Sequence, residues 1–183
     1  KTRRLGYDGK GQIRLRSVED LDAAWAKLGD APLILESLVS FEREISVIGI
    51  RSRTGEFKTY ALTQNFHQNS ILSASLSPAP NTAAFGDTAV GYARKLAEEL
   101  DYVGVFALEL FVHQGKLLAN EMAPRVHNSG HWTIEGAATS QFENHLRAVL
   151  GLPLGSTVET ETSVLLNWIG EVPDALPVLR EPL

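Results

Sequence analysis

The chain has no cysteine and a single methionine among its 183 residues. Without cysteine it can form no disulfide, no thiolate metal site and no cysteine nucleophile, which is compatible with the cytosol. It also lacks a long apolar run, because the stretch 103–112 is about half the length of a membrane helix and is interrupted by Glu109. No signal peptide or lipidation motif is recognisable. We therefore predict a cytoplasmic protein with no membrane partner.

The charge of the chain is distributed unevenly. The net charge is −5, but residues 1–16 carry +5 and the remainder carries −10. An acidic body argues against a nucleic-acid partner, for which a basic surface is expected. The basic opening segment favours a local site for an anion such as phosphate, although a solvated basic tail has the same composition.

The hydrophobic pattern predicts a globular α+β protein. The hydrophobic fraction is 44% and the charged fraction 21%, both ordinary for a soluble domain. Ser17 is expected to cap the first helix, Gly29 to end it, and Gly151 to end the last one. The expected helices cover residues 18–28, 82–100 and 140–150, and the expected strands cover residues 12–15, 33–38, 44–50, 56–62, 70–75, 104–112, 116–122 and 163–169.

Two carboxylates interrupt neighbouring apolar strands. Glu109 lies inside the run 105–112, and Glu121 lies near the end of the next strand. A three-residue hairpin loop over 113–115 would place Ala119 opposite Glu109, with Glu121 two residues further along the same face, roughly 7–8 Å away at Cα. A two-residue loop would put the two carboxylates on opposite faces.

A divalent cation explains such a pair. A lone buried carboxylate costs several kcal/mol, and two on one face repel each other. Mg²⁺ commonly binds one or two carboxylates together with phosphate oxygens of a substrate. The alternative is that Glu109 pairs with an arginine and Glu121 merely ends a strand.

Two loops contain groups suited to anions. Residues 124–131 combine an arginine, two histidines, an asparagine and a serine directly after Glu121. Residues 6–11 hold three glycines, whose backbone N–H groups can bind phosphate oxygens while Lys10 adds charge. The glycine loop is not a Walker A sequence, and an ordinary hairpin turn is its alternative explanation.

Three segments resemble one family of enzymes. They are Lys-Thr-Arg-Arg-Leu-Gly-Tyr-Asp-Gly-Lys-Gly-Gln (1–12), Glu-Ser-Leu-Val with Phe-Glu-Arg-Glu (36–39 and 41–44), and Asn-Glu-Met-Ala-Pro-Arg-Val-His-Asn-Ser-Gly-His (120–131). Together they resemble the ATP-grasp core of the N5-carboxyaminoimidazole ribonucleotide synthetase family, the ATPase subunit of phosphoribosylaminoimidazole carboxylase. The resemblance covers nearly the whole chain, and its last segment is the most specific.

The resemblance implies a role for each matching residue. Lys1 and the loop 6–12 would contact the nucleotide phosphates, Glu36 and Val39 the adenine, and Glu44 the ribose. The implied magnesium ligands are Glu109 and Glu121. The implied catalytic residues are Arg125, His127 and Lys10, and the implied substrate-binding residues are Tyr7, Asp8, Arg125, His127, Asn128 and Ser129. The implied nucleotide-binding residues are Lys1, Gly6, Tyr7, Asp8, Gly9, Lys10, Gly11, Gln12, Glu36, Ser37, Leu38, Val39, Glu44, His67, Asn120 and Glu121.

The implied reaction is an ATP-dependent carboxylation in purine biosynthesis. Bicarbonate attacks the γ-phosphate of ATP to form carboxyphosphate, which then carboxylates the amine of 5-aminoimidazole ribonucleotide. His127 either orients bicarbonate or manages a proton, and both roles stay open. His131 and Trp132 are expected to pack or to cap. Two alternatives are another ATP-grasp ligase, such as the formate-dependent glycinamide ribonucleotide transformylase, and a non-catalytic nucleotide-binding module.

The resemblance also implies a division of the chain. Residues 1–40 and 41–78 would form the smaller ATP-grasp lobe, and residues 79–170 the larger lobe with the metal and substrate site. Residues 171–183 would begin a further C-terminal domain, and the family's N-terminal nucleotide-fold domain would be absent. We expect such a central fragment to have little carboxylase activity alone, and the full-length protein to be a possible homodimer.

Overall fold

The chain forms two compact units. The computed structural model describes residues 1–4, 10–168 and 170. Unit 1 consists of Lys1–Ser40 with His67–Ile71, and unit 2 consists of Phe41–Phe66 with Leu72–Leu183. None of the described helices is both long enough and apolar enough to span a membrane.

Unit 1 contains one short helical segment. A turn of 3₁₀ helix (η1, Val18–Asp20) leads into α1 (Leu21–Leu28). Ser17 occupies the N-cap, where its backbone N–H donates to Asp20 Oδ2 at 3.2 Å. Gly29 follows as the C-cap. Both ends of the predicted helix are therefore confirmed, as expected for signals that act within a few residues.

The strands predicted over residues 12–15 and 33–38 are wrong. Within the described chain, residue Leu33 forms only an isolated antiparallel bridge with Thr2. Leu35 is 81% exposed, so the run is not buried. An apolar run becomes a strand only when a neighbouring strand accepts and donates its backbone hydrogen bonds, and here a single bridge does so.

A seven-stranded sheet forms the frame of unit 2. Six of its strands are ordered β6-β5-β1-β3-β4-β7, and the seventh, β2, pairs with β1. The pairs of β1 with β2, β3 and β5, of β5 with β6, and of β4 with β7 are antiparallel, which confirms the predicted α+β class. The strands are β1 (Arg43–Arg51), β2 (Phe57–Thr59), β3 (Thr63–Gln68), β4 (Ile71–Ser77), β5 (Gly104–His113), β6 (Lys116–Ala123) and β7 (Ser163–Leu166).

The strand prediction over 56–62 is wrong in extent. The structure ends β2 at Thr59, and β3, which begins at Thr63, was not among the predicted strands. The two compact units also divide the chain differently from the predicted lobes, because β1 and β3 lie in the same sheet as β5 and β6. The lobe assignment itself stays a prediction.

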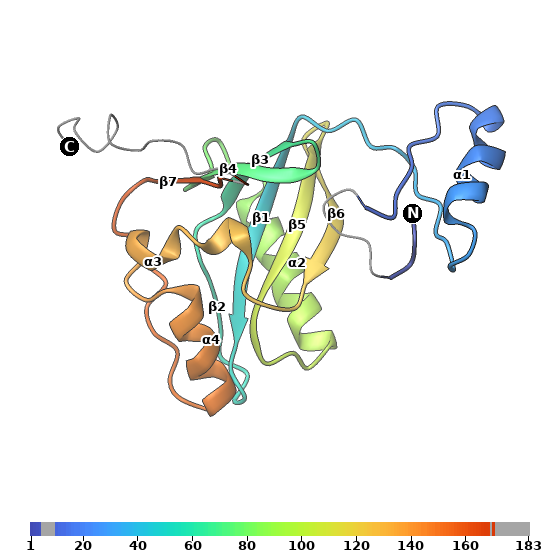
Figure 1. Ribbon diagram of the computed structural model, residues 1–183. Helices are drawn as coiled ribbons and strands as arrows, with labels where there is room; N and C mark the ends of the chain where they lie inside the picture. The colour runs from blue at the N-terminus through green and yellow to red at the C-terminus, as the bar shows by residue number, and fades with distance from the viewer. Residues whose placement is uncertain (5–9, 169, 171–183) are drawn as a thin grey trace. The chain divides into compact units, whose positions relative to one another are not determined.

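Helices cover both faces of this sheet (Figure 1). The alanines Ala89, Ala93 and Ala97 of α2 are fully buried in one core, whereas Ala148 of α4 lies in the other. Ser140 caps α4, since its Oγ accepts from the backbone N–H of Glu143 at 3.2 Å. Gly151 ends α4 with φ 73°, as the sequence predicts. The helical bounds are α2 (Gly86–Glu99), η2 (Asn128–Gly130), α3 (Thr133–Gly136) and α4 (Gln141–Leu150).

One face of the sheet carries apolar side chains at one end of its strands and polar side chains at the other. Alternate residues of a strand share a face, so the α4 side of β1 and β5 carries residues 46, 48 and 50 opposite residues 109, 107 and 105. We call Ile48, Ile50, Val105 and Ala107, which lie in the core with α4, the apolar half of this face. We call Ser46, Glu109 and Glu121 its polar half. The polar half lies at the point where a functional site is predicted.

Candidate functional site

The polar half is a row of side chains on three adjacent strands. Ser46 of β1 is opposite Glu109 of β5, and Glu109 is opposite Glu121 of β6. Directly opposed residues point to the same face with Cβ atoms about 4.5–5.5 Å apart. The prediction that the two carboxylates share a face is confirmed, and they are closer than the predicted diagonal arrangement.

The hairpin loop between β5 and β6 is shorter than the three-residue loop that was predicted. His113 is opposite Lys116, so the loop has two residues rather than three. Gln114 and Gly115 both have positive φ, 50° and 70°, as a two-residue hairpin turn requires. Such a turn by itself would place the two carboxylates on opposite faces, so another feature must correct the register.

That feature is a β-bulge at Asn120. Leu110 is opposite Ala119, but the next residue along β5, Glu109, is opposite Glu121. Asn120 is therefore an extra residue in β6, and it turns Glu121 onto the face of Glu109. Bulges of this kind commonly redirect a side chain at a functional site.

Glu109 is the buried member of the pair. Its exposed fraction is 9%, whereas Glu121 is exposed. Its Oε1 lies 3.6 Å from His127 Nε2, and its Oε2 accepts a long hydrogen bond from Asn120 Nδ2 at 3.4 Å. The Asn120 hydrogen bond and the nearby imidazole reduce the cost of burying the Glu109 carboxylate, and the exposed Glu121 leaves the pair open to solvent on one side.

The loop that carries His127 is held by a glutamine of α4. Gln141 is fully buried; its Oε1 accepts from the backbone N–H of His127 at 3.0 Å, and its Nε2 donates to the His127 carbonyl at 2.7 Å. Thr133 Oγ1 accepts from the Gln141 backbone N–H at 2.9 Å and donates to the Gly130 carbonyl at 2.7 Å. A Cβ on Gly130 would lie 2.7 Å from Gln141 Oε1, so a larger residue there would displace the Gln141 amide.

Sequence reasoning missed Gln141 and Thr133. Neither lies in the polar segment after β6, and no local pattern distinguishes a glutamine in the first turn of a helix from a surface residue. Ser46 was also missed, but it had a signal. It is the single polar residue in the run 45–50 of β1, just as Glu109 is in the run 105–112 of β5.

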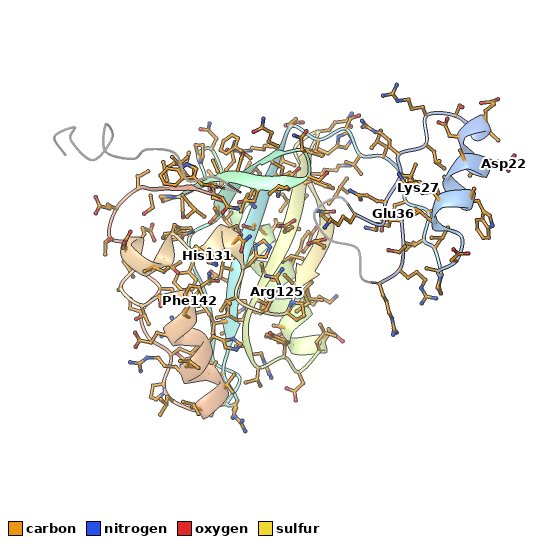
Figure 2. All side chains as sticks on the ribbon, viewed as in Figure 1. Asp22, Lys27, Glu36, Arg125, His131 and Phe142 are labelled. Atoms are coloured by element: carbon orange, nitrogen blue, oxygen red, sulfur yellow. The ribbon has the colours of Figure 1, made fainter. Side chains whose placement is uncertain are left out.

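The expectation that His131 and Trp132 pack is confirmed. Trp132 is 5% exposed, and its Nε1 donates to Thr63 Oγ1 at 3.1 Å. His131 stacks on Phe142 with ring centroids 5.5 Å apart (Figure 2). Burial, followed by the charge of Arg125, lowers the pKa of His131 below its ordinary value, so its neutral form is favoured.

The other predicted residues of this loop are arranged around His127. Arg125 is exposed, and its guanidinium donates to the Val126 carbonyl at 3.0 Å. Asn128 is exposed at the start of η2, and Ser129 is fully buried with its Oγ 2.9 Å from His127 Nδ1. The structure thus brings His127 to Glu109 and Ser129 to His127, and leaves Arg125 and Asn128 exposed.

In unit 1 the structure pairs two of the predicted nucleotide residues. Lys1 Nζ lies 2.7 Å from Glu36 Oε2, and the Lys1 carbonyl accepts from the Ile34 N–H at 2.8 Å. The residues that follow Glu36 are Ser37 and Leu38, which are exposed, and Val39, which is half-buried. These residues offer a lysine ammonium, a carboxylate and exposed backbone of the kind that contacts a nucleotide.

The remaining predicted positions are spread along the chain. Lys10 and Gln12 are exposed and Gly11 has φ 71°. His67 is exposed on β3, and Glu44 is half-buried on β1, on the face of the polar half. Four predicted residues lie outside the described residues: Gly6, Tyr7, Asp8 and Gly9.

The carboxylate pair suits a cation that receives other ligands from a substrate. No group of three or more histidine, cysteine, aspartate or glutamate side chains in the described part of the chain can hold a metal ion. Glu109 and Glu121 therefore offer a two-carboxylate site. Mg²⁺ takes one or two carboxylates and completes its shell with waters and substrate phosphate oxygens, so the donor set fits Mg²⁺ bound with a nucleotide.

The fold and this site define a member of the ATP-grasp family. The chain belongs to that family, since the model of the ATP-grasp domain matches residues 1–142. It is similar to N5-carboxyaminoimidazole ribonucleotide synthases. The synthase from Pseudomonas aeruginosa is 53% identical over 179 residues, which cover 98% of this chain and 49% of that protein.

Solved structures agree with this resemblance. The crystal structure of N5-carboxyaminoimidazole ribonucleotide synthetase from Thermus thermophilus has a TM-score of 0.86 and 55% identity, covering 91% of this chain and 46% of that one. The Aspergillus clavatus synthase in complex with ADP and 5-aminoimidazole ribonucleotide has a TM-score of 0.83 and 35% identity, covering 93% and 46%. The predicted resemblance is thus confirmed, and the chain spans about half the length of the relatives it matches.

Proposed function

We propose that this chain is the ATP-binding core of an enzyme that carboxylates 5-aminoimidazole ribonucleotide. In the proposed reaction a bicarbonate oxygen attacks the γ-phosphorus of ATP, ADP leaves, and carboxyphosphate forms. The exocyclic amine of 5-aminoimidazole ribonucleotide then attacks the carboxyl carbon, and phosphate leaves. The observation that carries the proposal is the opposition of Glu109 and Glu121 beside the His127 loop, in a chain similar to synthases of this activity over 98% of its length.

The proposed site assigns a task to each residue type. Lys1, Lys10 and Arg125 would supply positive charge toward phosphate oxygens, and Glu109 and Glu121 would hold Mg²⁺. When bound there, Mg²⁺ would neutralise the charge that builds up on the nucleotide phosphates during transfer. The adenosine contacts proposed are Glu36, Ser37, Leu38, Val39, Glu44 and His67, and Asn120 lies beside the nucleotide.

The substrate side is proposed from the loop after β6 and from the glycine segment. Arg125, His127, Asn128 and Ser129 would bind bicarbonate and the ribonucleotide, with Tyr7 and Asp8 near the aminoimidazole. Gly6, Gly9, Gly11 and Gln12 would bring backbone groups to the phosphates. A cytoplasmic location and a homodimer of the longer protein also belong to the proposal.

The acceptor is tested by replacing bicarbonate. We expect ADP release in the presence of Mg²⁺ and 5-aminoimidazole ribonucleotide to require bicarbonate, in a protein that contains this chain and the other half of its relatives' length. Formate with glycinamide ribonucleotide is the matched control, because a formate-dependent ATP-grasp ligase would respond to it instead. ADP release with formate alone would overturn the proposed substrate and keep the ATP-grasp assignment.

A further inference from the structure

A chain of buried hydrogen bonds crosses the sheet of unit 2 and ends on the His127 ring. It begins at Ser75 of β4, continues through Asn65 of β3 and Ser46 of β1, and reaches Ser129 of η2, all of them at most 5% exposed. The links measure 3.0 Å from Ser75 Oγ to Asn65 Oδ1, 3.2 Å from Asn65 Nδ2 to Ser46 Oγ, and 2.8 Å between the Oγ atoms of Ser46 and Ser129. The last link, Ser129 Oγ to His127 Nδ1, is 2.9 Å.

The direction of this chain follows from counting hydrogens. Ser75 donates to Asn65, whose amide N–H donates to Ser46, and Ser46 then donates its single hydrogen to Ser129. A hydroxyl has one hydrogen to give and two lone pairs to receive. Since Ser129 receives from Ser46, its own hydrogen is left for His127 Nδ1.

A second donor points to the same ring nitrogen. The backbone N–H of Ser129, which can only donate, lies 3.4 Å from His127 Nδ1, and His127 thereby caps η2. Rotating the Asn65 amide by half a turn would reverse every link and demand a hydrogen on Nδ1. That reversed chain would set two N–H groups against each other at His127, so the backbone donor selects the first direction.

We infer that Ser75, Asn65 and Ser46, which we call the serine relay, act through Ser129 to keep His127 Nδ1 an acceptor, so that the ring in its neutral form carries its hydrogen on Nε2. In this tautomer Nε2–H faces Glu109 Oε1, 3.6 Å away, and Nδ1 is an acceptor. The members of the serine relay are positioning residues, because none of them touches the predicted reactants.

The consequence concerns the two roles left open for His127, and it rests on the proposed function. A protonated Nε2 can donate to a carboxylate or to an anion such as bicarbonate, but it has no lone pair with which to take a proton. Nδ1 has a lone pair, but Ser129 occupies it. His127 therefore donates its Nε2 hydrogen to the Glu109 carboxylate or to an anion such as bicarbonate, and does not act as the general base.

Nuclear magnetic resonance tests the tautomer directly. With nitrogen-labelled histidines in this chain, at a pH where an imidazole is neutral, couplings between ring nitrogens and carbon-bound ring hydrogens distinguish the bare nitrogen from the protonated one. The inference predicts a bare Nδ1 and a protonated Nε2 for His127. A protonated Nδ1 or an equal mixture would overturn it. Because no turnover is measured, this result is independent of whether the proposed carboxylation is correct.

Two serine variants test the relay itself. Ser46→Ala interrupts the relay, and we expect the ratio of Nε2–H to Nδ1–H tautomer to fall roughly threefold to tenfold, the effect of one neutral hydrogen bond. Ser77→Ala is the matched control. Ser77 is equally buried on β4, and its Oγ has no partner among the described residues, so the ratio should not change.

A further variant covers the case in which Ser46→Ala does not fold. Ser75→Ala removes the outermost hydroxyl, frees the Asn65 amide to rotate, and is expected to lower the same ratio. Tautomer ratios equal to the wild-type value in Ser75→Ala, or in a folded Ser46→Ala, would contradict the relay.

Discussion

The apolar and polar halves of one sheet face use the same two strands for different purposes. In the apolar half, Ile48 and Ile50 are fully buried beneath α4, and each such side chain contributes about 1.5–3 kcal/mol to folding. In the polar half, at the next position of β1 and β5 on that face, the side chains are a serine and a carboxylate. The apolar half thus contributes free energy of folding that offsets the cost of burying Glu109 in the polar half.

The cost of burying the polar half is offset by residues distant in sequence. Glu109 and Ser46 would destabilise an isolated hairpin, because buried polar groups without partners cost free energy. Here their partners come from elements distant in sequence, such as His127 and Asn65. The continuous strand holds these groups within hydrogen-bonding distance, since its other half is fixed by packing.

The largest expected effect comes from removing one charge of the carboxylate pair. Glu109→Gln and Glu121→Gln should each lower Mg²⁺-dependent ADP release by about two to three orders of magnitude, because neither amide replaces an anionic ligand. Glu99→Gln, at the exposed end of α2, is the control and should keep wild-type release. If both pair variants retain activity, the chain is a nucleotide-binding module without catalysis at this pair.

The next largest effect is expected from a substitution in the apolar half that leaves the polar half unchanged. Ile48→Ala should lower the free energy of unfolding by about 3 kcal/mol, through lost burial and the cavity left behind. Urea titration measures the loss. The folded fraction should keep its dependence on Mg²⁺, and an equal loss of metal dependence would show that the two halves are not separable.

A smaller effect is expected where α4 holds the His127 loop. Gln141→Leu leaves the His127 backbone N–H and carbonyl without their partners, so unfolding should become easier by about 2 kcal/mol. Thermal and urea unfolding both report it. Gln68→Leu, an exposed glutamine at the end of β3, is the control and should change stability by less than about 0.5 kcal/mol. A Gln141→Leu value equal to that of the control would contradict the role of Gln141 in holding the His127 loop.

The smallest effect concerns His131. Because burial lowers the pKa of His131, the unfolded state binds its proton more readily than the folded state. The contribution to stability is therefore full above the ordinary histidine pKa and is lost as pH falls from there through the lowered pKa of the folded state. His131→Gln should flatten this part of the stability–pH curve, measured by unfolding at a series of pH values. An unchanged curve would remove His131 as the cause.

Three helix ends could be predicted from the sequence because their signals are local. Ser17 occupies an N-cap, and Gly29 and Gly151 follow the helices they end. The start of α2 was predicted wrongly, since the helix begins at Gly86 and not at residue 82. Strand pairing is not local, and the run 33–38 was misread for that reason. Its apolar residues resemble a buried strand, but whether they form one depends on a partner that no short pattern reveals.

In the β5–β6 hairpin of the candidate site, one feature was predicted correctly and another was not. Its two carboxylates could be found, because a charge inside an apolar strand is conspicuous. The loop length was wrong, and the shared face was reached only because the bulge at Asn120 compensates for it. Nothing in the residues around Asn120 predicts a bulge, and the partnership of Gln141 with His127 joins elements that sequence spacing cannot connect.

The most direct test of the central claim is a crystal structure of this chain with Mg²⁺ and ADP. Since the bulge brings Glu109 and Glu121 to one face, we predict one Mg²⁺ with a carboxylate oxygen of each residue about 2.0–2.1 Å away and the nucleotide phosphates completing its shell. A magnesium ion that contacts neither carboxylate, or only one of the two, would contradict the account.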